Sequence, residues 1–167
     1  AVDQAEMMPD AAFRVNSGIP RLLGEIARKN NIRMLHISTD YVYNGRLSLP
    51  HREDEEPAPV SVYARSKYDG ERVLQQNPSV IIIRTSWLYS GFGNNFLKSM
   101  IRLGLERKVL GVVFDQTGTP TYAGDLADAL LNIITFSEKE VFLPGIYNYS
   151  NEGVCSWYDF AVEIMKL

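Results

Sequence analysis

The sequence lacks the features that mark nucleic-acid-binding, membrane and disulfide-bonded proteins. Its 167 residues include 17 basic and 20 acidic side chains, so no basic excess is available to hold a nucleic-acid backbone or an anionic membrane. Apolar runs are short, as at 80–83, and the first residues have neither the charge nor the apolar core of a signal peptide. The single cysteine, Cys155, cannot form an internal disulfide. We therefore expect no nucleic-acid or membrane partner, and a location in the reducing cytoplasm.

Helical and strand-like patterns alternate along the chain. Gly18 and Pro20 predict a kink or break in the first helix, and Ser156 is suited to cap the last one. The expected helices cover 10–30, 62–76, 95–107 and 125–136, and the expected strands cover 33–37, 80–83, 109–114 and 146–149. This alternation predicts an α/β fold with a Rossmann-type parallel sheet and flanking helices.

A glycine-rich phosphate-binding turn is missing from this pattern. A dinucleotide-binding sheet usually opens with a strand, a Gly-x-x-Gly-x-x-Gly turn and a helix, whose backbone amides hold the pyrophosphate. No such spacing occurs in the chain, which starts and stops within helical patterns. We therefore expect residues 1–167 to be a single partial domain that lacks its cofactor-binding half and is catalytically silent alone.

Tyr63 and Lys67 are the strongest candidates for chemistry. Their spacing of four residues places them about one turn apart on one face of a helix. A tyrosine with an ordinary pKa near ~10 is a poor acid at neutral pH, but a cation within hydrogen-bonding range stabilises the phenolate and lowers that pKa. Lys67 could also hydrogen-bond the ribose of a nicotinamide cofactor. The same spacing also occurs on ordinary surface helices, so the pair gains its weight from its context.

The context is a strand that ends in hydroxyl groups. Ser38 and Thr39 follow the strand expected at 33–37 and precede Tyr63 by some two dozen residues. In an open α/β sheet the chemistry lies at such strand ends. Taken alone, Thr39 is better explained as part of a polar turn. The strand, the hydroxyl, the helix and the Tyr-Lys pair nevertheless occur in the order that a carbonyl reductase requires.

Five motifs together resemble one known family. They read S-T-D-Y-V-Y at 38–43, Y-A-R-S-K at 63–67, R-T-S-W-L-Y at 84–89, G-N-N-F at 93–96 and D-Q-T-G-T-P-T at 115–121. The chain is similar, almost end to end, to the dTDP-4-dehydrorhamnose reductases, which are extended short-chain dehydrogenases/reductases.

This resemblance implies a reaction and a cofactor. Enzymes of that family transfer hydride from NADPH or NADH to the 4-keto group of a dTDP-bound deoxysugar, giving dTDP-L-rhamnose for cell-surface polysaccharide. By resemblance Tyr63 is the general acid and Lys67 is its electrostatic partner. Thr39 is the residue whose hydroxyl adjusts the reactivity of the substrate carbonyl and of the phenol. Tyr63, Lys67 and Ser38 are expected at the cofactor. The choice between NADPH and NADH and the oligomeric state, including a homodimer, stay open.

The resemblance also assigns contacts with the sugar nucleotide. Thr39, Asp40, Tyr41 and Trp87 correspond to substrate-binding positions. By residue type alone Trp87 is better explained as a core aromatic, and the resemblance favours a sugar-stacking platform instead. Sugar-nucleotide dehydratases read Thr-Asp-Glu where this chain reads Thr-Asp-Tyr at 39–41. The glutamate is needed there because eliminating water requires another acid/base carboxylate. Simple reduction does not need that carboxylate.

Two other functions stay open. An epimerase or another reductase could use the same scaffold, and some relatives of this fold are regulatory subunits that retain the Tyr-Lys pair. The remaining polar residues have no predicted role. His36 is expected to be a satisfied core histidine and His51 to lie on the surface, while the charged run at 52–56 is expected to be a solvated loop. We predict no metal site.

Overall fold

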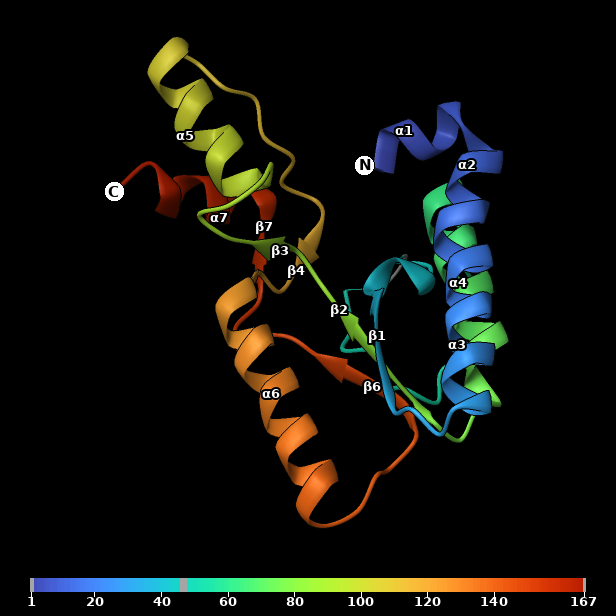
Figure 1. Ribbon diagram of the computed structural model, residues 1–167. Coiled ribbons are helices and arrows are strands. Elements are labelled where there is room, and N and C mark those ends of the chain that lie inside the picture. The colour runs from blue at the N-terminus through green and yellow to red at the C-terminus, as the bar shows by residue number, and fades with distance from the viewer. Residues whose placement is uncertain (1, 46–47, 167) are drawn as a thin grey trace. The chain divides into compact units, whose positions relative to one another are not determined.

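The structure is a computed structural model that describes residues 2–45 and 48–166 (Figure 1). Contacts group the chain into two compact units. The first unit contains residues 1–85 and 134–149, and the second contains residues 86–133 and 150–167. The single partial domain expected from the sequence stays a prediction.

The first unit is built on a parallel sheet. Its described strands follow the order β1-β2-β6, and every pair is parallel, with Thr39 beside Thr85 and Thr85 beside Tyr149 at the carboxyl ends. Its elements are α1 Val2–Met7, α2 Pro9–Phe13, the π-helix η1 Arg14–Gly18, α3 Ile19–Lys29, β1 Met34–Thr39, the 3-10 helix η2 Asp40–Val42, α4 Val62–Gln75, β2 Val80–Thr85 and β6 Gly145–Tyr149. The predicted α/β fold with a parallel sheet and flanking helices is therefore confirmed.

The break expected near Gly18 and Pro20 takes the form of a π-turn. The helix continues through Pro20, and the wide turn η1 lies directly before it. A proline has no N–H to give to the carbonyl four residues earlier, here that of Asn16, and a π-turn accommodates this loss without ending the helix. A Cβ on Gly70 of α4 would lie 2.1 Å from the Asn16 carbonyl oxygen. Glycine at position 70 therefore allows α4 to approach this turn closely.

The core of the first unit lies between β1, β2, β6 and α4. Leu74 of α4 packs with Val80 and Ile82 of β2, and Met34 and Ile146 border this cluster. Every residue of β2 is buried, because this strand lies between the other two. The central strand expected to be buried on both faces is thus confirmed.

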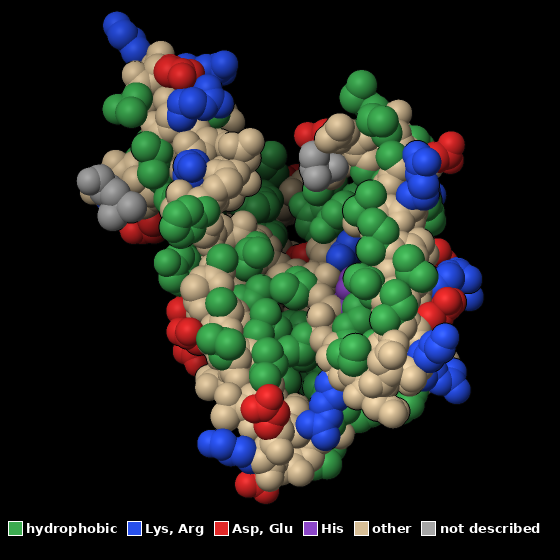
Figure 2. All heavy atoms as spheres, in the orientation of Figure 1, with side chains coloured by type: hydrophobic (Ala, Val, Ile, Leu, Met, Phe, Trp, Pro, Cys, Tyr) green, Lys and Arg blue, Asp and Glu red, His purple; other side chains and the backbone are tan. Residues whose placement is uncertain are grey.

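Helix α3 contacts α4 through its small residues. Gly24 and Ala27 are buried, and a Cβ on Gly24 would lie 2.5 Å from a Leu74 methyl. The larger apolar side chains of α3 stay exposed, and Figure 2 shows hydrophobic side chains gathered over this helix. They are Ile19, Leu22, Leu23 and Ile26. Their spacing makes one helical stripe that points away from α4.

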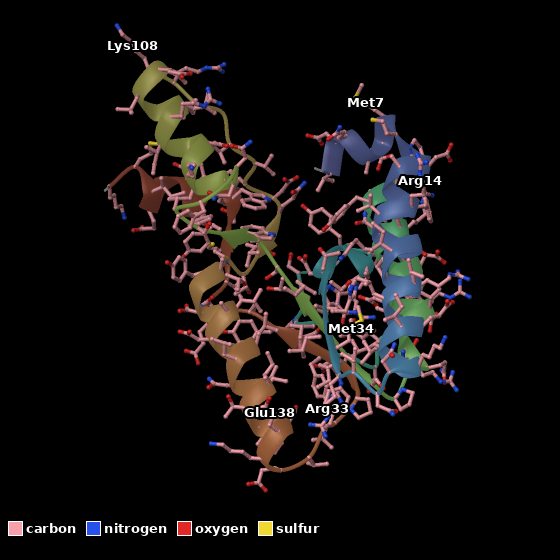
Figure 3. All side chains as sticks on the ribbon, viewed as in Figure 1. Met7, Arg14, Arg33, Met34, Lys108 and Glu138 are labelled. Atoms are coloured by element: carbon pink, nitrogen blue, oxygen red, sulfur yellow. The ribbon has the colours of Figure 1, made fainter. Side chains whose placement is uncertain are left out.

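The second unit combines short paired strands with helices. β3 pairs with β5 in parallel, and β4 pairs with β7 antiparallel. Its elements are β3 Leu88–Tyr89, α5 Phe96–Glu106, β4 Thr117–Gly118, β5 Thr121–Tyr122, β7 Cys155–Ser156 and α7 Trp157–Ile164. Met100 of α5 packs against Ala161 and Ile164 of α7. Helix α6, Ala123–Lys139, begins in this unit and ends in the first. Its tail is joined to the start of β1 by Arg33, which donates to the Ser137 carbonyl. Figure 3 labels Arg33 at the start of β1 and Glu138 in the tail of α6.

The strand expected at 109–114 is wrong. These residues form neither helix nor strand, and Val109, Val113 and Phe114 are exposed. Only Val112 joins the apolar cluster of α5 and α7, while the Val113 carbonyl accepts a hydrogen bond from the N–H of Tyr158. β-branched residues form a strand only where a partner strand supplies hydrogen bonds. Within the described part of the chain, this segment has a helix end as its partner instead.

The predicted cap of the last helix is confirmed. The Ser156 hydroxyl accepts from the N–H of Asp159, and the Asp159 carboxylate accepts from the N–H of Ser156, which is a complete capping box. The other predicted elements exist, with ends displaced by up to three residues, as in α6. No helix among residues 2–45 and 48–166 is long and apolar enough to cross a membrane.

Candidate active site

The first turns of α4 carry the Tyr-Lys pair. Ser61 caps the helix by accepting a hydrogen bond from the N–H of Ala64 at 3.1 Å, which fixes where α4 begins. Tyr63 and Lys67 then share one face of the helix, as their spacing predicted. Lys67 Nζ donates to the carbonyl oxygen of Ile37 on β1 at 2.7 Å. This bond ties the lysine to the strand that ends in the predicted hydroxyl groups.

The end of β1 brings the predicted polar residues to Tyr63. The Thr39 hydroxyl donates to the Asp40 carboxylate at 3.1 Å and accepts from the N–H of Tyr41 at 3.3 Å. Thr39 also lies close enough to Tyr63 for its hydroxyl to lower the pKa of the phenol. The rings of Tyr41 and Tyr63 meet edge to face, 5.9 Å apart. The structure thus places Thr39, Asp40 and Tyr41 around the phenol of Tyr63.

The pKa of Tyr63 does not follow the sequence prediction. Burial raises it above the ordinary value, and the hydrogen bond with Thr39 offsets only part of that effect. The expected lowering by Lys67 is wrong for this chain, since the ammonium group bonds the Ile37 carbonyl instead of the phenol. Burial also lowers the pKa of Lys67, and the Glu71 charge opposes this. The phenol is therefore held in its protonated form at neutral pH.

Two further groups near this site are perturbed. Burial raises the pKa of Asp40 to about 6, although the Thr39 hydrogen bond opposes it. Burial and then the Lys67 charge lower the pKa of His36 to about 4. The His36 Nε2 is buried without a partner, so the prediction of a satisfied core histidine is wrong. Ser38 is buried too, and its hydroxyl is also unpartnered.

A buried ion pair lies beneath this site. Arg84 of β2 donates from Nη2 to a Glu71 carboxylate oxygen at 2.6 Å and from Nε to both oxygens at 3.1 and 3.2 Å. Arg84 Nη1 also donates to the Tyr43 hydroxyl at 2.8 Å. Tyr43 directly follows η2, which carries Asp40 and Tyr41. The pair therefore anchors the turn that presents the two candidate substrate residues.

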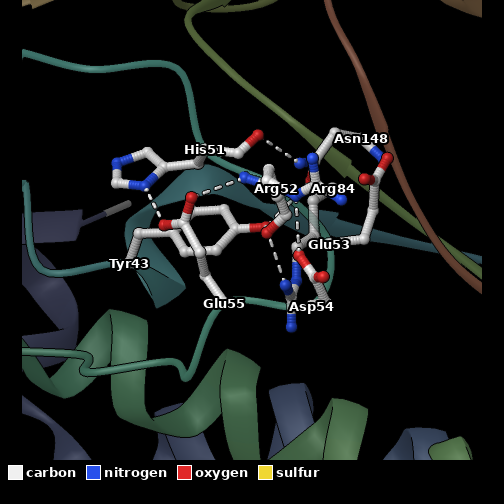
Figure 4. Close-up of polar contacts among 8 residues, drawn as sticks. All are labelled: Tyr43, His51, Arg52, Glu53, Asp54, Glu55, Arg84 and Asn148. Carbon is white, nitrogen blue, oxygen red and sulfur yellow. Dashed lines mark hydrogen bonds and ion pairs between the residues drawn. The ribbon is translucent and has the colours of Figure 1, made fainter.

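The segment at 51–56 is attached to the same network (Figure 4). The Tyr43 ring stacks on His51 at 4.3 Å, and His51 Nδ1 lies 2.7 Å from the Glu55 carboxylate. The Glu53 carboxylate accepts from the N–H of Asn148 on β6 at 2.9 Å. The solvated loop expected at 52–56 is confirmed, since this segment is irregular and mostly exposed. His51, which was expected at the surface, is half-buried against Tyr43. This network was not predicted from the sequence. The signal that could have indicated it is the presence of charged residues within a buried helix and a buried strand.

Trp87, the remaining predicted site residue, belongs to the second unit. Its ring is half-buried and stacks on Trp157, with 3.5 Å between ring centres and 7° between planes. Trp157 was not identified from the sequence, where an aromatic at the start of a capped helix is an ordinary core residue. In the part of the chain that the structure describes, no three His, Cys, Asp or Glu residues are grouped to hold a metal ion.

Known proteins resemble the chain over nearly its whole length. Residues 1–167 match the model of a family described as the RmlD substrate binding domain. A dTDP-4-dehydrorhamnose reductase from Aggregatibacter actinomycetemcomitans is 45% identical over 98% of this chain and 56% of its own length. The spore coat polysaccharide biosynthesis protein SpsK of Bacillus subtilis (strain 168) is 41% identical over 99% of this chain and 57% of its own length. The chain thus spans somewhat more than half the length of these relatives.

Solved structures give the same result. A dTDP-4-dehydrorhamnose reductase from Bacillus anthracis str. Ames, in complex with NADP, matches with a TM-score of 0.91 and 41% identity over 99% of this chain and 58% of that one. The ortholog from Clostridium acetobutylicum ATCC 824 matches with a TM-score of 0.92 and 41% identity over 99% of this chain and 57% of that one. The chain belongs to the family of the RmlD substrate binding domain, and the resemblance to dTDP-4-dehydrorhamnose reductases that its motifs indicated is confirmed.

Proposed function

We propose that the whole protein reduces the 4-keto group of dTDP-4-dehydro-L-rhamnose to dTDP-L-rhamnose with NADPH or NADH, in nucleotide-sugar and cell-surface polysaccharide synthesis. The observation that carries this proposal is the meeting of Thr39, Tyr63 and Lys67 at the carboxyl end of β1. A carbonyl reductase needs a proton donor and a hydroxyl side by side at such a position. The relatives named as dTDP-4-dehydrorhamnose reductases support the choice of substrate.

Tyr63 is proposed to give its phenolic proton to the carbonyl oxygen of the sugar. A raised pKa suits this role, because the phenol must be protonated before each turnover. The Thr39 hydroxyl is held by Asp40 and acts on the Tyr63 phenol, so Thr39 is suited to orient the donor. Lys67 is bonded to the Ile37 carbonyl, so its proposed role is at the cofactor and not at the phenol.

The residues present fit the nicotinamide end of a cofactor. The unpartnered hydroxyl of Ser38 lies on β1 next to Thr39, and Lys67 Nζ bonds the same strand. We propose that Lys67 binds the ribose and that Ser38 and Tyr63 complete this contact. When bound, the nicotinamide would supply the hydride, while the chain's own residues supply the proton and the orientation of the sugar.

Substrate contacts are proposed for Thr39, Asp40, Tyr41 and Trp87. The first three surround Tyr63 in the first unit. The contact by Trp87 rests on the family resemblance. The cytoplasmic location and a homodimer stay predictions.

The decisive experiment follows the oxidation of NADPH and NADH by the whole protein with dTDP-4-dehydro-L-rhamnose. Oxidation that depends on this substrate, with dTDP-L-rhamnose as product, supports the proposal. Oxidation only with another sugar nucleotide would identify a different reductase. Inversion at a sugar carbon without net oxidation would identify an epimerase. Cofactor binding without turnover would favour a regulatory subunit.

A further inference from the structure

Trp87 has a backbone conformation that large side chains rarely adopt. Its φ is 44°, and among the described non-glycine residues only Asn31 also has a positive φ. A bulky residue in the left-handed region is strained and persists only where its surroundings hold it. The Trp87 carbonyl accepts from the N–H of Thr121 at 3.2 Å, and the Ser86 hydroxyl donates to the Thr119 carbonyl at 2.7 Å. The direction of the indole is therefore set by its surroundings.

Both faces of this indole are covered. Trp157 stacks on one face at 3.5 Å. A Cβ on Gly118 would lie 2.4, 2.6 and 2.7 Å from Cε2, Cζ2 and Nε1 of Trp87, which are its three nearest atoms. Nearly equal distances to adjacent ring atoms, with the middle atom closest, place Gly118 above the ring and not beside its edge. Because no Trp157 atom is among the nearest three, Gly118 lies against the opposite face.

The two sides of this clamp come from one strand pair. Gly118 ends β4 and is paired with Cys155 of β7, and Trp157 follows β7 as the first residue of α7. The ring of Phe96 lies 4.5 Å from Trp157 and supports it. The gap that holds Trp87 is thus set by strand pairing and by the start of a helix.

We propose that Gly118 and Trp157 clamp Trp87 so that it meets its ligand with the indole edge, through Nε1–H, and not with a ring face. The identity of the ligand, the sugar of a dTDP-sugar, rests on the proposed function. With both faces covered, no face of the indole is left for the stacking platform that the resemblance favoured. No described protein group accepts a hydrogen bond from the Trp87 Nε1–H, and this atom is not buried. A sugar oxygen is a suitable acceptor.

The clamp can be tested without any turnover. Two rings stacked this closely stabilise the protein jointly, so substitutions at the two positions should not act independently. In urea denaturation of the whole protein, Trp87→Ala and Trp157→Ala should each lower the midpoint, and the double variant should lower it by clearly less than the sum of the two shifts. Additive shifts would overturn the clamp, whatever reaction the protein catalyses.

The edge contact is tested by steady-state kinetics. Gly118→Ala should raise the KM for the sugar nucleotide roughly tenfold, with the cofactor KM changed less than about twofold, because the displaced indole loses its aligned contact. Gly111→Ala is the matched control, since a Cβ there has nothing within 4 Å, and it should behave like the parent.

Trp87→Phe keeps a ring face but loses the N–H, so it distinguishes the edge from the face. The edge contact predicts that this variant loses sugar affinity as Gly118→Ala does, while Trp157→Phe keeps it within about threefold. A parent-like KM for Trp87→Phe, in a protein that turns over the dTDP-sugar, would overturn the edge contact and leave the proposed function intact. Failure of the proposed function would show instead as absent turnover in the parent.

Discussion

The two units hold their candidate functional side chains by different means. In the first, Thr39, Tyr63 and Lys67 are positioned by hydrogen bonds above a buried ion pair. In the second, Trp87 is held between another indole and a glycine. Removing one partner of a polar contact leaves the other buried and unpaired, whereas a stacked ring can be exchanged for another ring. Polar changes in the first unit should therefore have larger effects than shape-preserving changes in the second.

The largest expected effect is on turnover. Tyr63→Phe should lower kcat by roughly 10²- to 10⁴-fold, because it removes the proton donor and little volume. Cofactor affinity, measured by titration calorimetry, should fall far less than kcat, because the proposed contacts of Lys67 and Ser38 with the cofactor remain. Tyr68→Phe, on the same helix, is the control and should stay near the parent. Near-parental turnover by Tyr63→Phe would show that another group supplies the proton.

The next effect concerns the stability of the first unit. Glu71→Gln leaves the Arg84 guanidinium buried without its counter-charge, so the free energy of unfolding should fall by about 3–5 kcal/mol in urea denaturation. The exposed pair Arg102 and Glu106 on α5 provides the comparison. Glu106→Gln should change stability by less than about 1 kcal/mol. Equal losses for both variants would remove the distinction between buried and exposed pairs.

A smaller, pH-dependent effect is expected at Asp40. Its pKa in the folded chain is about 6, above the ordinary 3.8, so the stability that it contributes is present below pH 3.8 and is lost as the pH rises through 6. Asp40→Asn should therefore stabilise the protein by up to about 3 kcal/mol at pH 8 and by little near pH 4.

His36 has the opposite dependence, since its lowered pKa makes stability fall as the pH drops from 6.5 through about 4. The parent protein and Asp40→Asn both carry His36, so the contribution of His36 cancels when their free energies of unfolding are compared. Asp54→Asn, at an exposed carboxylate, should give no stabilisation. A gain for Asp40→Asn that does not grow with pH would contradict a raised pKa at Asp40.

The smallest effect is expected at the start of α7. Ser156→Ala removes the cap directly before Trp157 and should lower the unfolding free energy by about 1 kcal/mol. Since ring stacking holds Trp157 as well, the non-additive effect of Trp87→Ala and Trp157→Ala on the urea midpoint should persist in this variant. Additive effects in the Ser156→Ala protein would mean that the cap, and not the stack, positions the ring.

Local pattern was enough to predict most of the framework. The β-branched run at 80–83 predicted the buried central strand, and four-residue spacing placed Tyr63 and Lys67 on one helix face. Neighbours along the chain decide such features. The segment at 109–114 has the same kind of composition but pairs with no strand among the described residues, so the prediction failed there.

The sequence by itself determined the parallel α/β architecture and the order of the strand-end hydroxyl and the Tyr-Lys helix, because both depend on residues close in the chain. Only the tertiary structure decided the direction of the Tyr63 pKa shift, since burial depends on the whole fold. It also decided the Arg84–Glu71–Tyr43 network and the covered faces of Trp87. Those contacts join residues far apart in sequence, and no periodic pattern records which distant side chains will meet.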